Sequence, residues 1–160
     1  MGLGKYDLYF ADYSEAKIKL AKRIYYLANP TSQPTASPSF DVNKKYTYYL
    51  THLAGNDLGA NADGQLATSS LLGSTKAVYV DSLGFIWFTD DNALRSINPL
   101  TKRTFLAAGS LTTDYLYNNY NNMLATSARL FPYGVSGDSL NNIYVSDYLN
   151  HYVNKIDRYT

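Results

Sequence analysis

Short stretches in which apolar and polar residues alternate recur along the chain, and turn-forming residues separate them. The clearest case lies within Leu130–Asp157, where the apolar stretch 143–145 runs into an aspartate-bearing turn. A second alternating stretch, Tyr152–Ile156, follows that turn at once. Alternation at a period of two is typical of strands with one buried face, and a short turn joins two of them into a hairpin. The pattern therefore predicts an antiparallel all-β protein.

This hairpin belongs to an internal repeat. Three segments align, each with an apolar strand, a small residue and then aspartate: Asp7–Ile18, Phe85–Leu94 and Asn142–Val153. An Asp-Ser-Leu turn precedes the second and third segments, and the sequence QLATSSLL at 65–72 matches MLATSARL at 123–130. Because repeats of this size are typical of solenoids and propellers, the repeat outweighs local propensity where the two disagree.

Propensity and repeat disagree at Ser14–Ile24. This segment consists largely of good helix formers and would be a helix by propensity alone. The stretch Lys17–Leu20 also alternates at a period of two, and the repeat requires a strand at this position. We therefore expect a strand here.

Each repeat contains four strands, which we label a to d. Strand a precedes the Asp-Ser-Leu turn, strand b carries an aromatic residue, strand c follows the aspartate turn, and strand d ends in Ala-Gly, at 46–53 and 103–107. Four antiparallel strands per unit are typical of propeller blades. The order along the chain is b-c-d, a-b-c-d, a-b-c, which predicts a partial β-propeller.

The whole chain, 1–160, is expected to form one such segment. The first blade spans 1–55, lacks strand a and carries a Pro/Ser-rich loop at 29–43; a second insertion spans 114–122. The second blade spans 74–109 and the third 131–160, which lacks strand d. Unpaired strand edges invite pairing with another chain. We therefore expect a protein partner, either a further copy or further blades, at the open edges.

Composition narrows the function without identifying it. The 160 residues include no cysteine, so disulfides and thiolate metal sites are excluded, and the net charge is only +1. That balance argues against a surface built to bind nucleic acid or anionic lipid. No apolar run is long enough to cross a bilayer, and the N-terminus lacks a signal-peptide core, so membrane insertion is not expected. The 17 tyrosines favour half-buried pleated surfaces.

Aspartates recur at fixed positions in the repeat. Asp12, Asp90 and Asp147 each follow strand b, while Asp81 and Asp138 each begin the Asp-Ser-Leu turn. A carboxylate at such a position accepts backbone N–H groups of the turn. A catalytic residue need not recur in every blade, so we interpret all of them as structural.

The chain offers few groups for catalysis. His52 and His151 are the only imidazoles, and they lie on an outer strand and in a turn. No phosphate-binding glycine loop and no nucleophile elbow is present, and histidines do not recur as an inward-facing metal site would require. We expect no catalytic residue, no metal and no cofactor.

Several segments resemble the NHL-repeat β-propellers: 59–72, 131–147 and 148–157. The last keeps the Asn150-His151 pair from which such repeats take part of their name. The middle repeat departs from the pattern with its short Asp91-Asn92 turn, and strand a of the third carries Gly137 where a bulkier residue is usual. The resemblance implies a propeller, commonly six-bladed, that binds proteins, RNA or small ligands, and in a minority of members acts as a lyase or lactonase.

The first hypothesis is a non-catalytic binding or scaffold module, with a lean towards extracellular or surface structure implied by the resemblance. Its loop-tip candidates for contact are Tyr148, Asn150, His151 and Tyr152. The second is an RNA-binding module that uses the basic cluster at 17–23 and nearby tyrosines. The third is a propeller lyase or lactonase.

Overall fold

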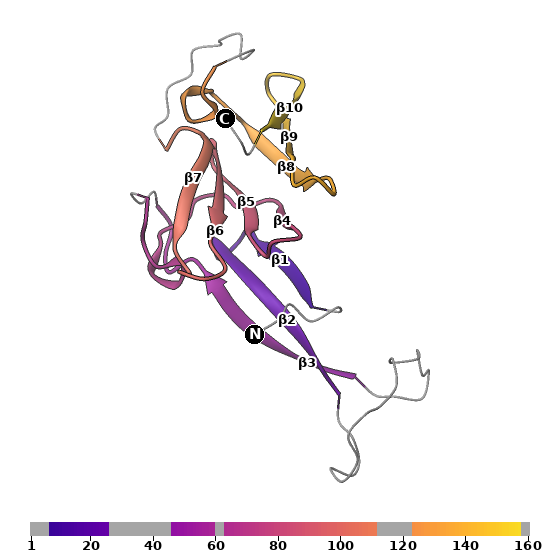
Figure 1. The fold of residues 1–160 in the computed structure, drawn as a ribbon. Helices are drawn as coiled ribbons and strands as arrows, with labels where there is room; N and C mark the ends of the chain where they lie inside the picture. The colour runs from indigo at the N-terminus through magenta and orange to yellow at the C-terminus, as the bar shows by residue number, and fades with distance from the viewer. Residues whose placement is uncertain (1–6, 26–45, 60–62, 112–122, 158–160) are drawn as a thin grey trace.

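The computed structural model describes residues 7–25, 46–59, 63–111 and 123–157, and it is all-β. Ten strands form three antiparallel sheets of three, four and three strands (Figure 1). The predicted loops at 29–43 and 114–122 lie entirely outside the described residues. Within the described ranges, no helix has the length and apolar character that crossing a membrane requires.

The first sheet contains β1 (Leu8–Asp12), β2 (Lys17–Tyr25) and β3 (Tyr46–Ala54), in the order β1-β2-β3. Strand β1 pairs only with the first five residues of β2, whereas β2 and β3 stay paired as far as Tyr25 and Tyr46. The two long strands therefore continue as a ribbon beyond the sheet, as Figure 1 shows.

The second sheet is a complete four-stranded blade. It contains β4 (Val78–Val80), β5 (Ile86–Asp90), β6 (Ala93–Ile97) and β7 (Thr104–Gly109), each paired with the next. All five residues of β6 are buried, because neighbouring strands lie on both edges and other blades cover both faces.

The third sheet contains β8 (Pro132–Gly137), β9 (Ile143–Asp147) and β10 (Tyr152–Ile156), in the order β10-β9-β8. The three sheets thus follow the predicted order b-c-d, a-b-c-d and a-b-c. The prediction of a partial propeller-like all-β arrangement is confirmed at this level.

The strand predicted over the helix-forming segment is also confirmed, since 17–25 forms β2. Helix propensity fails here because β2 pairs along one edge with β1 and along the other with β3. Ile18 is fully buried in the core, as is Ala16 in the preceding turn. Tertiary pairing and burial outweigh differences in intrinsic propensity, which amount to less than about 1 kcal/mol per residue.

The repeated Ala-Thr-Ser motif forms an element that the sequence did not predict. It folds into a single turn of 3₁₀ helix in both copies, η1 (Ala67–Ser69) and η2 (Ala125–Ser127). Each turn lies in the connection that leads from strand d of one blade to the next blade. In the first copy, Gly55 N–H donates to Ala67 O, which fixes the connection against the end of β3.

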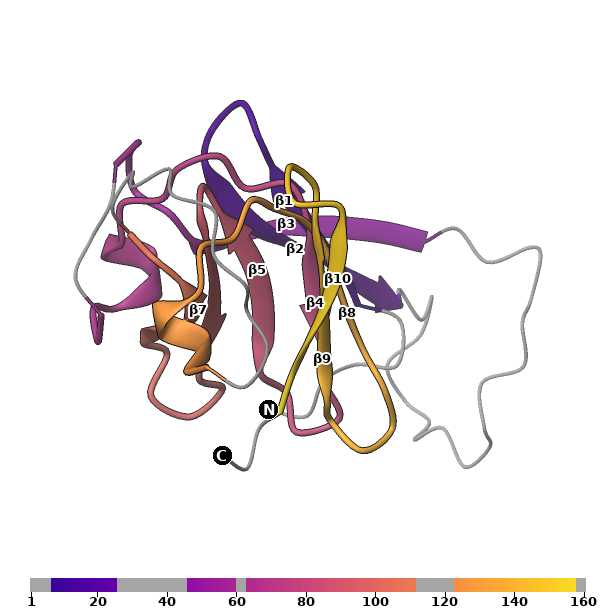
Figure 2. The same cartoon turned by 90° about the horizontal axis from the view of Figure 1, so that it is seen from above.

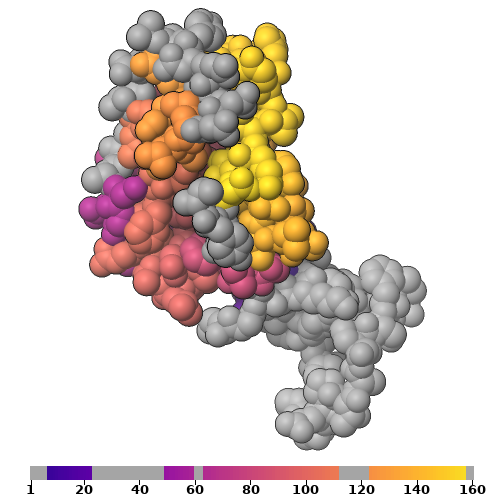
Figure 3. All heavy atoms as spheres, turned by 45° about the horizontal axis from the view of Figure 1, so that its top comes forward, coloured from indigo at the N-terminus to yellow at the C-terminus, as the bar shows by residue number. Residues whose placement is uncertain are grey.

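Two hydrophobic clusters hold the blades together. The first joins the first and second sheets through Ile18, Leu72 and Phe88, all fully buried. The second joins the second and third sheets through Leu94 and Val145, with further members from both blades. Figures 2 and 3 show the third blade directly beside the second. Each such side chain contributes about 1.5–3 kcal/mol by leaving water.

Gly137 is explained by this close approach of blades. A Cβ atom at Gly137 would lie 2.6 Å from Cε1 of Tyr79 in β4. The absence of a side chain lets the first strand of the third blade pack against the first strand of the second. The departure from the repeat pattern therefore reflects packing between blades.

Candidate functional site

The aspartate that ends strand b occupies one position in all three blades, and one hydrogen-bond pattern recurs at this position in the second and third blades. Asp90 Oδ1 accepts the N–H of Gly73 at 2.6 Å, and Asp147 Oδ1 accepts that of Phe131 at 3.0 Å. Both donors belong to the connection that enters strand a of the same blade. The carboxylate therefore fastens the incoming chain to the end of strand b.

Asp90 is buried with a cation. Its Oδ2 accepts a hydrogen bond from Arg95 Nη1 at 3.1 Å, and Arg95 is completely buried. Arg95 Nη2 donates to Thr104 Oγ1, which also lies 3.1 Å from the hydroxyl of Ser70. Burial raises the pKa of Asp90, although the bonds from Gly73 and Arg95 oppose that rise. This network joins strands b, c and d of the second blade.

Asp12 holds the same position in the first blade but lies nearer the surface. Lys19 Nζ donates to Asp12 Oδ2 at 2.6 Å, and Ser14 Oγ donates to Oδ1 at 2.7 Å. These bonds, led by the one from Lys19, lower the pKa of Asp12 to about 2. Glu15 pairs with both Lys17 and Lys19. Two lysines of the predicted basic cluster are therefore neutralised within the turn, which weakens the case for RNA binding.

Asp147 has amide partners in place of a cation. Its Oδ2 accepts hydrogen bonds from Asn150 Nδ2 at 2.8 Å and from Asn154 Nδ2 at 3.4 Å. The side chain that binds the aspartate comes from one position of strand c in each blade: Lys19, Arg95 and Asn154. In each hairpin, this residue lies two positions after the strand-c residue that pairs with the aspartate. One position of strand c thus binds the recurring carboxylate in every blade.

The two Asp-Ser-Leu turns have the same pattern of hydrogen bonds. Asp81 Oδ1 accepts two N–H groups of its own turn and Oδ2 accepts the indole N–H of Trp87 at 2.9 Å. Asp138 accepts the corresponding N–H groups, and the hydroxyl of Tyr144 donates to its Oδ2 at 3.0 Å. Hydrogen bonds from Asn142 lead the lowering of the pKa of Asp138. These carboxylates organise the turns and connect them to strand b.

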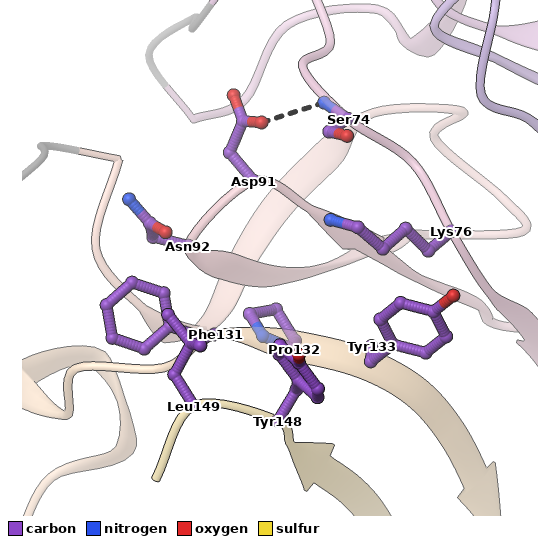
Figure 4. A pocket seen from close by; sticks show the side chains of 9 residues that line it. All are labelled: Ser74, Lys76, Asp91, Asn92, Phe131, Pro132, Tyr133, Tyr148 and Leu149. Atoms are coloured by element: carbon purple, nitrogen blue, oxygen red, sulfur yellow. Dashed lines mark hydrogen bonds between the residues drawn. The ribbon is translucent and has the colours of Figure 1, made fainter.

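A surface pocket of about 300 Å³ lies at the junction of the second and third blades (Figure 4). It is formed by the residues that enter strand a and by the b–c turns of the two blades: Ser74, Lys76, Asp91, Asn92, Phe131, Pro132, Tyr133, Tyr148 and Leu149. All of these residues lie at one end of the strands. The pocket therefore belongs to a single loop face of the molecule.

The two walls of the pocket use equivalent positions of the repeat. Lys76 precedes Ala77, whose N–H donates to the hydroxyl of Thr89. Tyr133 precedes Gly134, whose N–H donates in the same way to the hydroxyl of Ser146. Asp91 and Tyr148 each follow the aspartate of strand b. The second blade thus contributes a charged pair and the third an aromatic pair, and the rings of Tyr133 and Tyr148 lie 6.0 Å apart between centroids.

Of the four predicted loop-tip residues, only Tyr148 lines this pocket. Asn150 turns its amide inwards, to Asp147 and to the carbonyl of Arg129 at 3.2 Å. His151 has a φ of 58° and occupies the left-handed position of the turn, and Tyr152 begins β10 with its side chain exposed. The sequence did not single out Lys76, Asp91 or Tyr133 as site residues, although the repeat makes Lys76 equivalent to Tyr133 and Asp91 equivalent to Tyr148.

Metal-binding side chains do not cluster in the described part of the chain. No group of three or more His, Asp or Glu side chains is placed to hold a metal ion among those residues. His52 lies on β3, with Nε2 2.8 Å from the carbonyl of Ala54, and is remote in sequence from the pocket residues. The pocket therefore offers binding groups and a lysine, and it contains no histidine.

Comparison with known proteins supports the fold. No family model matches the chain, and no curated protein matches it. A structural genomics protein of unknown function from Bacteroides thetaiotaomicron has a similar crystal structure, with a TM-score of 0.59 at 13% identity. The match covers 93% of this chain and 32% of that one, so this chain spans about a third of its length. At this identity the likeness shows a shared β-rich fold.

Proposed function

We propose that the chain is a non-catalytic NHL-type β-propeller module for binding or scaffolding, and that it takes up a partner strand beside β1. The observation that carries this proposal is the state of Asp12. Its counterparts Asp90 and Asp147 each accept an N–H from a chain entering strand a, whereas Asp12 accepts the N–H of Glu15 and the hydroxyl of Ser14 from its own turn. The first blade therefore has the carboxylate that would accept an N–H from a chain entering strand a, but the described residues do not include such a chain.

The edge of β1 is suited to such a strand. Within the described residues β1 has one neighbour, β2. Its sequence, LYFAD, contains neither lysine nor proline, the residues that commonly protect exposed edges from pairing. Leu8 is 57% exposed and Phe10 is also exposed on the same side of the strand. A partner strand would complete the backbone hydrogen bonds and cover these two side chains.

A second edge supports the scaffold role. Strand β10 is paired with β9 alone among the described residues, and its Tyr152 and Val153 are exposed. The partner at either edge is a protein strand, from a further copy or from further blades. Both sources present the same backbone chemistry.

The experiment supplies the missing strand as a peptide. A synthetic peptide with the sequence of residues 73–81, which includes strand a of the second blade (β4), is titrated into the isotopically labelled chain. We expect amide shifts concentrated at residues 8–12 and slower hydrogen exchange there. A scrambled peptide of the same composition is the control. Shifts spread evenly over the chain, or none at β1, would contradict the proposal.

A matched pair of variants separates the edge from general surface effects. Leu8→Lys places a charge on the β1 edge, while Leu100→Lys places one in an exposed c–d turn, where Leu100 is 89% exposed. We expect the first variant to lose peptide binding and any concentration-dependent association measured by light scattering. The second should behave as the parent. Equal behaviour of the two variants counts against an edge site.

A further inference from the structure

We infer that the pocket between the second and third blades binds a neutral carbohydrate, with one sugar ring against Tyr133 and Tyr148. The pocket is separate from the strand site at β1, because none of the residues that line it belongs to the first blade. The ligand class follows from the two walls of the pocket, one from each blade, which differ in chemistry.

The third-blade wall provides an aromatic surface. Tyr133 is 59% exposed and Tyr148 is 64% exposed, and their rings are tilted by 45° at a centroid separation of 6.0 Å. Pro132 is fully buried beneath them, which fixes the backbone that carries Tyr133. The face of an aromatic ring is electron-rich and favours the weakly positive C–H groups of a partner. A pyranose ring presents such C–H groups on one face.

The second-blade wall provides polar groups of both kinds. Asp91 Oδ1 accepts the N–H of Ser74 at 2.9 Å, which directs the carboxylate towards the connection that enters strand a of the second blade. Asn92 brings an amide and Lys76 an ammonium group, whose Nζ lies 6.0 Å from the ring centroid of Tyr133. Hydroxyl groups both donate and accept hydrogen bonds. A ligand rich in hydroxyls can therefore pair with both the donors and the acceptors among these groups.

Charge selects a neutral ligand over an anionic one. The formal charges of Lys76 and Asp91 cancel within the pocket, and no other charged side chain lines it. A phosphate or carboxylate would gain from Lys76 but would face the carboxylate of Asp91 on the same wall. An acidic peptide and a nucleic acid are thus disfavoured relative to an uncharged polyol.

The size of the pocket limits how much ligand it holds. A volume of about 300 Å³ lies at the lower end of the range for small-molecule sites. One sugar ring fills such a space, and the remainder of an oligosaccharide would extend over the loop face. Figure 4 shows Lys76 extended over the third-blade wall and Asp91 directed to Ser74.

The test begins with a glycan microarray that carries neutral, sialylated and sulfated glycans. We expect binding to a set of neutral glycans that share one terminal or accessible sugar. The best neutral glycan is then measured by calorimetry against the parent chain and two variants. Tyr148→Ala should weaken binding by about tenfold or more, because it removes one of the two tyrosine rings against which the sugar packs.

Tyr152→Ala is the matched control. Tyr152 belongs to the same hairpin, is 60% exposed and does not line the pocket, so its loss should leave the affinity unchanged. Asp91→Asn should reduce binding while retaining an acceptor for Ser74 N–H. Thermal unfolding of each variant confirms that the fold is intact, and binding of the strand-a peptide at β1 should be unaffected.

Four results of the glycan measurements would overturn the inference. These are no glycan bound on the array, preference for the acidic glycans, equal loss from Tyr148→Ala and Tyr152→Ala, and no loss from either. A panel of acidic and neutral peptides run in parallel would reveal a peptide site, which also overturns it.

Discussion

The first and second blades place an ion pair at the same position of the repeat, yet the two pairs differ in environment. Asp90–Arg95 is almost fully buried, whereas Asp12–Lys19 is partly exposed. Burial raises the pKa of Asp90, while the hydrogen bond from Lys19 lowers that of Asp12. One sequence position can therefore carry opposite electrostatic behaviour, because strand a and the connection before it cover Asp90 and nothing equivalent among the described residues covers Asp12.

The largest expected effect comes from breaking the buried pair. Arg95→Met keeps an apolar stem but leaves the Asp90 carboxylate buried without its cation, which should lower the free energy of unfolding by about 3–5 kcal/mol. Lys19→Met at the equivalent position should cost far less, since water reaches that site. Urea unfolding of both variants tests the contrast.

A double variant distinguishes charge burial from lost packing. Asp90→Asn combined with Arg95→Met removes both charges and keeps an acceptor for Gly73 N–H. It should recover a large part of the stability lost by Arg95→Met alone. Failure to recover any would show that the arginine acts mainly through its packing and its bond to Thr104.

The next largest loss of stability is expected from replacing a glycine at the end of strand d, and it should be equal in the first and second blades. Gly55 and Gly109 close the first and second blades with φ values of 92° and 81°. A Cβ there would lie 2.1 Å from Ala16 O or 2.2 Å from Asn92 O, both backbone atoms of a b–c turn. Either glycine changed to alanine should cost at least about 2 kcal/mol by clash and backbone strain. Markedly unequal losses in thermal unfolding would contradict this shared constraint.

A smaller contrast is expected between the second and third blades. Trp87→Phe removes the donor to Asp81 in a buried site and should cost about 1–3 kcal/mol. Tyr144→Phe removes the equivalent donor to Asp138 at a more exposed site and should cost less. Chemical denaturation of the two variants, with near-ultraviolet circular dichroism as a check on tertiary structure, measures the difference.

The smallest effect concerns pH. The folded pKa of Asp12 is lowered to about 2, so its stabilisation is present above the unfolded pKa near 4 and is lost as the pH falls towards 2. The pKa of Asp90 is raised, so its contribution is present below the unfolded pKa and is lost as the pH rises through the folded value.

Unfolding of two variants between pH 2 and 6 separates these contributions. Asp12→Asn should show a shallower loss of stability on acidification than the parent, and Asp90→Asn a steeper one. If the curves of stability against pH for both variants run parallel to that of the parent, neither carboxylate has a folded pKa distinct from its unfolded value.

The sequence by itself determined the strand order. Alternation located the strands, and the repeat placed a strand within 14–24, where β2 forms at 17–25, against the helix propensity of that segment. The recurring aspartates marked the ends of strand b. These features are local or periodic, so they can be read from one sequence.

Only the tertiary structure decided what surrounds each repeated position. Arg95 lies in a short strand of mixed polarity, and its complete burial depends on β5, β7 and the connection before β4. The pocket joins Lys76 and Asp91 to Tyr133 and Tyr148 from the next blade. Of the four predicted loop-tip residues, the hairpin turned Tyr148 towards this space and Asn150 inwards. Sequence spacing cannot supply such placements, because they depend on how neighbouring blades pack.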